Sequence, residues 1–494
     1  MPEPARTIED SGPADRAVEQ FGVDTIPESE RTSRPRDVAA ILIGGNLALS
    51  VGVFGWLPIL YGLSWWSAVT AIVAGTVVGA ATVTPMALLG YRTGTNNSVT
   101  SGAFFGVRGR LVASVIGLLL CLGYVALTIW TGGDALVATL DRLRGAEETT
   151  GQLVLGYAVL AVAVAAVAVY GFRWLLRVNT LIVWVVGATM VLTVIGLWGG
   201  FSAATPSPDP AYLLGDFWPT WLLAALTAGV AGPVSYVTQT GDWTRYITPR
   251  LHRPRPLLLA TFGGLLAGLL LPTLWGAFVA TAAFDETSFV VGLVAGVPTW
   301  LLIPTLIGAL VGSLGQGAMN LYSMGLDLDA ILPRLSRVQS TMLVTLGSTA
   351  LVFLGRFVWD AETAVTTFVV VLTSLATPWA VITLIGYWRT RARFDEAALQ
   401  VFNHRGTGGR YWYSGGWNAG ALGAWAVGSV VGVLSNSTDA YTGPFAEQLG
   451  GIDISFLTSG VAAAVVYLVA LGLHPQWRGD LGPGEPARAD GGRA

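Results

Sequence analysis

The sequence predicts an all-α polytopic membrane protein with about twelve transmembrane helices. Only 12% of its 494 residues are charged and 53% are hydrophobic, whereas a soluble domain carries about 25% charged residues. The mean hydropathy is +0.61. Successive apolar runs approach the length needed to cross a hydrocarbon core of about 30 Å. We place these runs near 38–60, 65–91, 111–138, 152–172, 175–199, 217–240, 257–283, 299–324, 341–359, 364–388, 417–435 and 455–473.

The arginines indicate how these runs are oriented. All 27 basic residues are arginine. If the N-terminus is cytoplasmic, only Arg142, Arg144 and Arg356 fall in outside loops and the other 24 lie inside, as the positive-inside rule requires. We therefore expect a protein of the cytoplasmic membrane with both termini cytoplasmic. Residues 1–36 and 475–494 would be tails, the first of them disordered because it is polar and rich in Pro, Glu, Ser and Arg.

Composition excludes several functional classes. A formal net charge of −3 argues against a nucleic-acid partner. Cys121 is the only cysteine and lies in an apolar run, so we expect no disulfide and no cysteine-based metal site. The sequence contains no phosphate-binding glycine loop, nucleophile elbow or nucleotide-binding domain. We expect neither a cofactor nor an enzymatic activity. The histidines, which lie in or beside loops, are His252, His404 and His474.

Two of the runs carry residues that interrupt a helix. The first run has Gly-Gly-Asn at 44–46, and the sixth has Gly229, Gly232 and Pro233. Glycine loosens a helix and an interior proline removes a backbone hydrogen bond. In lipid, freed backbone groups cost several kcal/mol unless protein, water or a ligand satisfies them. Either run alone could be a kinked, packed helix. Two interrupted helices, each opening one half of the chain, indicate an inverted-repeat transporter.

Glycines four residues apart recur in three other runs. Such pairs let membrane helices approach closely, so we interpret them as packing sites. They are Gly75 and Gly79, Gly264 and Gly268, and Gly308 and Gly312.

Polar residues follow one face of the third and the eighth run. Intramembrane polar groups point into the bundle or a wet cavity, although single Ser and Thr residues more often hold helices together. Gln316 and Asn320 are one turn apart and favour ligand contact, because an amide offers both a donor and an acceptor to a heterocycle. The two sets are Tyr124, Thr128, Thr131 and Asp134, and Ser313, Gln316, Asn320 and Ser323.

Ionisable groups near the membrane are few. Asp134 lies near the outer end of the third run, where a functional role and a surface position are equally compatible with the sequence. Asp242 precedes Arg245 by three residues, which favours a local ion pair. Asp327 and Asp329 follow the eighth run, and we expect both to be solvated.

Several stretches resemble the nucleobase–cation symporter family, which comprises permeases for cytosine, purines, uracil, hydantoin and thiamine. Each stretch is weak by itself, whereas their order and spacing are specific. Together they cover the chain from about residue 22 to 473. They are GGNLAL at 44–49, RTG at 92–94, FGVRG at 105–109, GDWTRY at 241–246 (similar to the family's Asp-x-x-Arg-Tyr) and NLYSMGL at 320–326.

The resemblance implies a five-plus-five inverted repeat. Its halves would occupy 37–199 and 217–390, followed by a cytoplasmic loop at 391–415 and two added helices within 416–474. The first and sixth helices would be discontinuous at the binding site and would face the third and eighth helices.

The resemblance also implies a flat substrate held between aromatic rings, with amides bonding its edge. Tyr124 matches the aromatic position of the third helix, Thr128 matches its Gln, and Asn320 matches the Asn of the eighth helix. In the sixth helix Gly-Pro replaces the family's Gly-Trp, which leaves Tyr236 as the nearest aromatic residue. With Gln316 added from the polar face, the expected substrate contacts are Tyr124, Thr128, Gly232, Pro233, Tyr236, Gln316 and Asn320.

Sodium-coupled relatives resemble one another in an ion site between the first and eighth helices. Its two hydroxyl positions are Leu314 and Gly315 here, and three carbonyls are few for a hard cation that prefers about five or six oxygens. A shift of one residue would add Ser313. Protons are the alternative, with Asp134 as the carrier. The matching carbonyls are those of Gly44, Leu47 and Val311.

These observations predict a secondary transporter that imports a nucleobase together with a cation. The predicted cation is a proton, and sodium is the alternative. Permeation of a hydantoin, allantoin or a thiamine-like vitamin is the alternative within transporters. An intramembrane enzyme would need convergent ionisable groups at mid-depth, which the sequence does not offer. A receptor or scaffold would bind its ligand without accumulating it. The expected partners are a small heterocycle, the coupling ion and the lipid bilayer.

Overall fold

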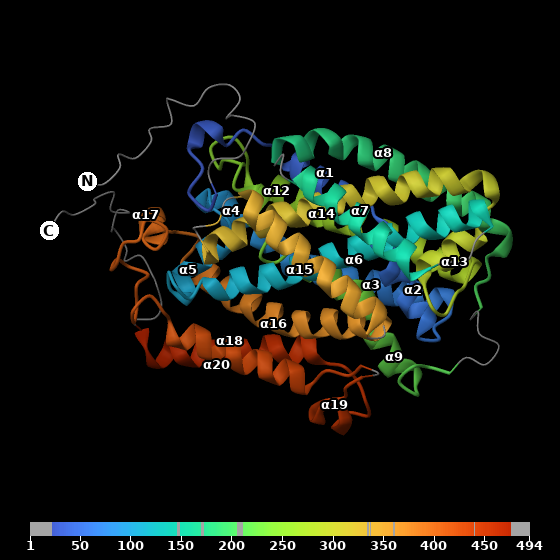
Figure 1. The fold of residues 1–494 in the computed structure, drawn as a ribbon. Helices are drawn as coiled ribbons and strands as arrows, with labels where there is room; N and C mark the ends of the chain where they lie inside the picture. Colours follow the sequence, from blue (N-terminus) through green and yellow to red (C-terminus); the bar gives the residue numbers. More distant parts are fainter. Residues whose placement is uncertain are drawn as a thin grey trace.

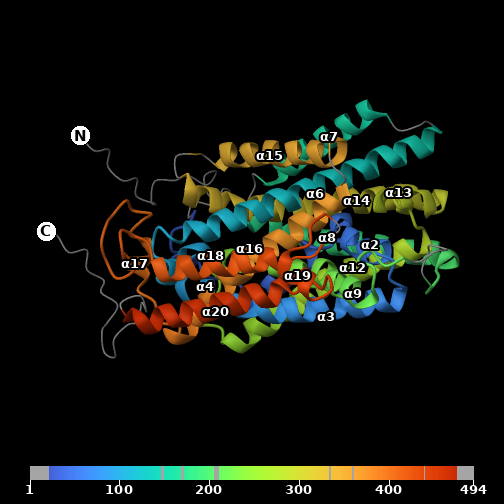
Figure 2. The ribbon, with the colours of Figure 1, turned by 90° about the horizontal axis from the view of Figure 1, so that it is seen from below.

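The structure is a computed structural model that describes residues 22–145, 149–168, 172–204, 211–332, 335, 337–358, 361–438 and 440–475. Within these ranges the chain is helical, with three isolated β-bridges and no strand. The long helices run side by side along one axis, with α4, α5 and α17 near one end and α2, α9 and α13 toward the other (Figures 1 and 2). The all-α prediction is confirmed.

The first half of the chain contains α1 (Pro35–Gly44), α2 (Leu49–Leu60), α3 (Trp65–Val83), α4 (Ala87–Thr93), α5 (Asn97–Phe105), α6 (Leu111–Arg144), α7 (Thr150–Ala168) and α8 (Phe172–Leu197). The second half contains α9 (Phe217–Ala224), the π-helix η6 (Ala225–Val230), α10 (Ala231–Val234), α11 (Thr240–Thr244), α12 (Pro254–Ala282), α13 (Phe289–Gly296), α14 (Leu302–Ile331), α15 (Arg337–Phe357) and α16 (Ala361–Arg389). After these come α17 (Glu396–Gln400), α18 (Ala419–Leu434), α19 (Pro444–Gln448) and α20 (Ser455–Leu473).

Every predicted apolar run coincides with one of these helices or with a broken pair. By length and apolar character, ten helices of the described ranges can cross a membrane, or eleven if the bent pair α1–α2 is one span. The remaining run, at 417–435, forms α18, which is apolar but shorter. Large apolar side chains such as Val162, Trp184 and Leu346 are exposed on the outside of the bundle, as expected of a surface that contacts lipid.

The helix contacts follow an inverted repeat. The first span, α1 and α2, packs on α12, and its counterpart, the span of α9, η6 and α10, packs on α3. Helices of the first half have counterparts in the second half, and the counterparts make matching contacts. The contact of α8 with α14 thus corresponds to that of α16 with α6. Likewise, α7–α14 corresponds to α15–α6, and α1–α8 to α10–α16. The pattern of helix contacts therefore agrees with the predicted five-plus-five inverted repeat.

The glycine pairs lie at these repeat-related contacts. A Cβ added at Gly75 of α3 would stand 2.1 Å from the Ala225 carbonyl oxygen. A Cβ added at Gly268 of α12 would stand 2.2 Å from the Leu42 carbonyl oxygen. Each glycine thus lets a backbone of the broken span approach closely, as the packing interpretation predicts.

The first span is broken where the sequence predicts. α1 and α2 meet at an angle of 64°, and residues 45–48 between them are not helical. The Asn46 amide donates to the Leu42 carbonyl over 2.7 Å, which satisfies one backbone acceptor freed at the end of α1.

The sixth span is interrupted at a different place from the one that glycine and proline suggest. Gly229 lies inside the π-helix η6 and Pro233 inside α10, so the helix continues through both. It ends at Val234, and a turn at 235–239 leads to α11. The predicted discontinuity is present, but it follows the proline.

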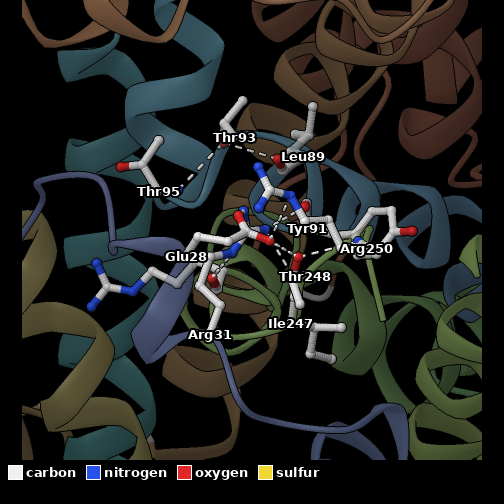
Figure 3. A network of polar contacts seen from close by, with 10 residues as sticks. Glu28, Arg31, Leu89, Tyr91, Thr93, Thr95, Ile247, Thr248 and Arg250 are labelled. Atoms are coloured by element: carbon white, nitrogen blue, oxygen red, sulfur yellow. Dashed lines mark hydrogen bonds and ion pairs between the residues drawn. The ribbon is translucent and has the colours of Figure 1, made fainter. Parts of the chain in front are cut away.

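Residues 22–34 form a strap across the α4 end of the bundle, whereas the sequence predicts disorder from 1 to 36. The Arg31 guanidinium is buried and donates to the carbonyls of Arg245, Tyr91 and Ile247, over 3.0, 2.5 and 2.7 Å (Figure 3). Burial lowers the pKa of Arg31, and Glu28 beside it opposes this shift. Disorder is thus a wrong prediction for this part, because composition does not reveal the carbonyls that hold it. Residues 1–21 and 476–494 lie outside the described residues.

Candidate functional site

A closed cavity lies where the break in the first span meets the sixth span. Its volume is about 10 Å³, roughly the space of one water molecule. The walls come from the break itself, α2, α6, the sixth span and α12. The lining residues are Asn46, Val51, Phe54, Tyr124, Thr227, Ala228, Gly229, Gly232, Ser235, Tyr236, Leu269 and Thr273.

A hydrogen bond joins the two interrupted spans at this cavity. The Tyr236 hydroxyl donates to the Asn46 Oδ1 over 2.7 Å, and both side chains are buried. Both also line the cavity. The amide and the phenol therefore present polar atoms at the cavity where the two interrupted spans meet.

Aromatic rings form a second wall of the cavity. Tyr124 lies with its ring centroid 6.1 Å from that of Phe54 and 6.4 Å from that of Phe368. Tyr236 instead contacts Trp243, with centroids 5.8 Å apart. One aromatic neighbour of Tyr124 in the cavity wall, Phe54, thus comes from the first span, whereas the resemblance implies a partner ring from the sixth.

Gln316 connects α14 with the first span and with α6. Its Oε1 accepts hydrogen bonds from the hydroxyls of Ser50 and Thr128, the latter over 3.1 Å. The Asn320 amide donates back to the Gln316 carbonyl over 3.0 Å. Gln316, Thr128 and Asn320 are buried but are not part of the cavity wall. The structure thus brings the predicted amides to one corner, one layer behind the cavity.

Gly232 and Pro233 have different surroundings. Gly232 lines the cavity. Pro233 packs toward α3, where a Cβ added at Gly79 would stand 3.1 Å from its Cγ. Pro233 therefore belongs to a helix contact, and its role as a substrate contact stays a prediction.

The predicted cation ligands are brought together only in part. The Leu47 carbonyl oxygen lies 2.7 Å from the position that a Cβ on Gly312 would take, and Gly312 follows Val311 in the chain. Gly44 is the last residue of α1 and is buried. The Ser313 hydroxyl lies against Gly132 of α6 and is buried, with no hydrogen-bond partner among the described residues. Ser313 thus faces α6 instead of the first span.

Both carboxyl groups of interest, Asp134 and Asp327, are buried in the bundle. The Asp134 Oδ1 accepts a hydrogen bond from the Tyr157 hydroxyl of α7 over 2.6 Å, and Asp134 does not line the cavity. Asp327 is 3% exposed and accepts from the Ser98 hydroxyl over 2.9 Å. The expectation that Asp327 is solvated is wrong, because α14 extends to Ile331 and carries it into the bundle.

Sequence reasoning missed several residues of the site. Asn46 belongs to the quoted GGNLAL stretch, and its position in a helix break was a usable signal. Phe54, Thr227 and Ser235 gave no signal, because one apolar or hydroxyl residue in an apolar run is common. Only packing shows that they face one cavity.

Three solved structures that resemble this chain are structures of transporters. The chain is similar to Mhp1, a nucleobase-cation-symport-1 family transporter, in a closed conformation with bromovinylhydantoin bound, with a TM-score of 0.70, 20% identity and coverage of 92% of this chain and 95% of that one. The inward-facing conformation of Mhp1 gives a TM-score of 0.71 at 20% identity, covering 93% and 95%. A sodium-coupled sialic acid symporter gives 0.56 at 13% identity, covering 92% of each.

Fold and site therefore define a multi-pass membrane protein with a cavity between two interrupted spans. Residues 25–458 match the family described as permease for cytosine/purines, uracil, thiamine, allantoin. The chain belongs to this family of permeases. It is also 22% identical over 468 residues to a putative purine-cytosine permease, YxlA, of Bacillus subtilis (strain 168), covering 92% of this chain and 96% of that protein.

Proposed function

We propose that the protein imports a nucleobase or a closely related flat heterocycle in symport with a proton. The observation that carries the proposal is the pairing of aromatic rings with amide groups at the junction of two interrupted spans. A flat ring stacks on an aromatic face, and an amide matches the mixed donors and acceptors of its edge.

The substrate is tested by uptake into proteoliposomes, with labelled cytosine, uracil, adenine, hydantoin, allantoin and thiamine. We expect saturable accumulation of one nucleobase above its outside concentration. Asn46→Ala should lower the apparent affinity about ten- to a hundredfold, because the Asn46 amide lines the cavity and one ligand hydrogen bond is worth about 1–3 kcal/mol. Normal uptake by this variant would place the substrate elsewhere. Binding without accumulation would favour a receptor.

A hydantoin is the second candidate substrate. It is favoured by the similarity to the Mhp1 structure that contains bromovinylhydantoin. If excess cytosine and purines do not inhibit the uptake of hydantoin, this candidate is favoured over the first.

The coupling ion is proposed to be a proton because the sodium ligand set is incomplete: Ser313 faces α6 and adds no oxygen to the site. Asp327 is better placed to carry a proton than Asp134, which is bonded to Tyr157. Among the described residues, Asp327 has no ion-pair partner, and its ionisable neighbours are Asp242 and Cys121. A buried carboxylate without a cation costs several kcal/mol, which a bound proton avoids.

A pH gradient in sodium-free vesicles tests this assignment. Uptake should follow an inward proton gradient, and Asp327→Asn should abolish the dependence while Asp134→Asn leaves it in place. Uptake that requires sodium and ignores pH would overturn the proposal in favour of a sodium-coupled symporter.

The orientation and the division of the chain stay proposals as well. We propose cytoplasmic termini, repeats at 37–199 and 217–390, a cytoplasmic loop at 391–415 and two further helices within 416–474. In a Cys121→Ala background, single cysteines at 211–216 and 285–297 should react with an impermeant reagent from outside. Labelling of positions 246–256 from outside would reverse the orientation.

A further inference from the structure

A second cavity lies at the strap end of the bundle, away from the site described above. Its volume is about 480 Å³, within the range of about 300–1,000 Å³ typical of small-molecule sites. Four segments far apart in the sequence form it: the strap, the start of α6, the end of α14 and the loop after α17. Its main lining residues are Asp24, Arg108, Arg110, Asp329, Phe402 and Arg405.

Arg110 is the most unusual residue of this cavity. Its side chain is 1% exposed. The Nη2 donates to the Asn403 Oδ1, whereas the Nε and Nη1 have no hydrogen-bond partner among the described residues. The guanidinium lies 5.2 Å from the centroid of the Phe402 ring. A buried cation with two unsatisfied donors is costly, and burial lowers the pKa of Arg110 to about 10.

Asp24 and Asp329 act on this cation through space, but among the described residues neither forms a hydrogen bond with its two free donors. Asp24 lies 3.5 Å from the His404 imidazole and forms no ion pair with Arg110 within the described ranges. Asp329 lies against Gly22 of the strap. Two further arginines, Arg108 and Arg405, line the same cavity, so it carries more positive than negative charge. An anion is the ligand that such a cavity lacks.

We propose that this cavity binds a phosphate group, carried by a small phosphorylated solute or by a lipid headgroup. A guanidinium offers donors in a planar fork that matches phosphate oxygens. The volume leaves space for an organic group beside the phosphate. The site is separate from the transported substrate, so it does not depend on which heterocycle is carried.

Binding would affect the strap end of the bundle as a whole. The strap lies against the end of α14 through Gly22 and Asp329. It contacts α17 through the Gln400 amide, which donates to the Val23 carbonyl over 3.3 Å. A phosphate bound between Arg110 and Arg405 would therefore link segments that must separate if this end opens. Binding is expected to stabilise the closed arrangement by mass action.

Thermal unfolding of the full chain in phosphatidylcholine nanodiscs, in phosphate-free buffer at fixed ionic strength, tests the site. We expect inorganic phosphate to raise the midpoint saturably and more than chloride does. The apparent affinity should fall at least tenfold in Arg110→Gln and severalfold in Arg405→Gln. Arg250→Gln is the matched control, because Arg250 is 81% exposed and outside the cavity. If Arg110→Gln fails to fold, Arg110→Lys and Arg405→Gln provide the test.

A second arm distinguishes the two sources of phosphate. Nanodiscs that contain phosphatidic acid, without free phosphate, should raise the midpoint through the same arginines if the ligand is a lipid. Stabilisation by inorganic phosphate alone assigns a soluble solute. The proposal is overturned if neither source raises the midpoint, or if Arg405→Gln and Arg250→Gln respond alike.

Discussion

The two interrupted spans open the two halves of the bundle, and they are interrupted in different ways. Between α1 and α2 the chain bends by 64° at its Gly-Gly-Asn. In the sixth span the helix passes through Gly229 and Pro233 and ends only at Val234. A glycine in a membrane helix can serve either to release the backbone or to let a neighbour approach, and the two spans use it differently.

The difference follows from what each segment contacts. At the first break, Asn46 bonds the Leu42 carbonyl and accepts from Tyr236, so side chains replace backbone hydrogen bonds. In the sixth span, a Cβ on Gly229 would stand 2.6 Å from the Gly75 Cα. This glycine is therefore used for packing, which leaves the helix intact around it.

The largest effect is expected from substitutions at the repeat-related glycines. Gly75→Ala and Gly268→Ala each drive a methyl group into a backbone carbonyl, and such overpacking costs about 1–3 kcal/mol or more. Both should lower the thermal midpoint strongly and by similar amounts. Gly263→Ala is the control, since no atom lies within 4 Å of its added Cβ. Equal midpoints for all three variants would contradict the packing role.

The next largest effect is on substrate affinity, and it tests whether the ring of Phe54 in the first span acts together with Tyr124. Phe54→Ala and Tyr124→Ala should each lower substrate affinity about tenfold, because an aromatic contact contributes about 0.5–1.5 kcal/mol beyond its area. Tyr124→Trp should be tolerated. Phe353→Ala, in a stack with Phe357 on α15, should leave affinity unchanged in the same binding assay. An unchanged affinity in Phe54→Ala would remove the first span from the site.

A smaller effect tests the bond between the breaks. Asn46→Ala and Tyr236→Phe, measured singly and together, should show a coupling free energy of about 1 kcal/mol in thermal unfolding, the typical value for a hydrogen bond. Thr82→Ala with Tyr236→Phe serves as the control pair, because Thr82 bonds only within its own helix. Additive effects of Asn46→Ala and Tyr236→Phe would show that the bond does not hold the spans together.

The smallest effect is expected at Gly232. Its added Cβ would meet only the end of the flexible Leu269 side chain, at 3.3 Å. Gly232→Ala should therefore change the free energy of unfolding by less than about 1 kcal/mol, with a small shift in the thermal midpoint. Gly229→Ala, three residues away, should be far more destabilising because it meets backbone. Similar midpoints for the two variants would show that packing does not distinguish these glycines.

Hydropathy and the spacing of small residues predicted the positions of the spans, the first break and the packing of the glycine pairs. These features depend on local composition, which the bilayer forces to be apolar over the length of each span. The tyrosine and amides of the site were likewise recognisable, because polar groups within such runs are scarce.

The remaining features were decided by tertiary contacts. Pro233 packs toward Gly79, Asp134 bonds Tyr157, and Ser313 faces Gly132. Each side chain has a direction that depends on the rotation of its helix, which neighbouring helices fix. The sequence by itself determined which segments cross the membrane and carry polar groups. Only the packed bundle decided that Phe54 faces Tyr124, that Asp327 is buried and that the strap holds Arg31, because each depends on a partner far away in the chain.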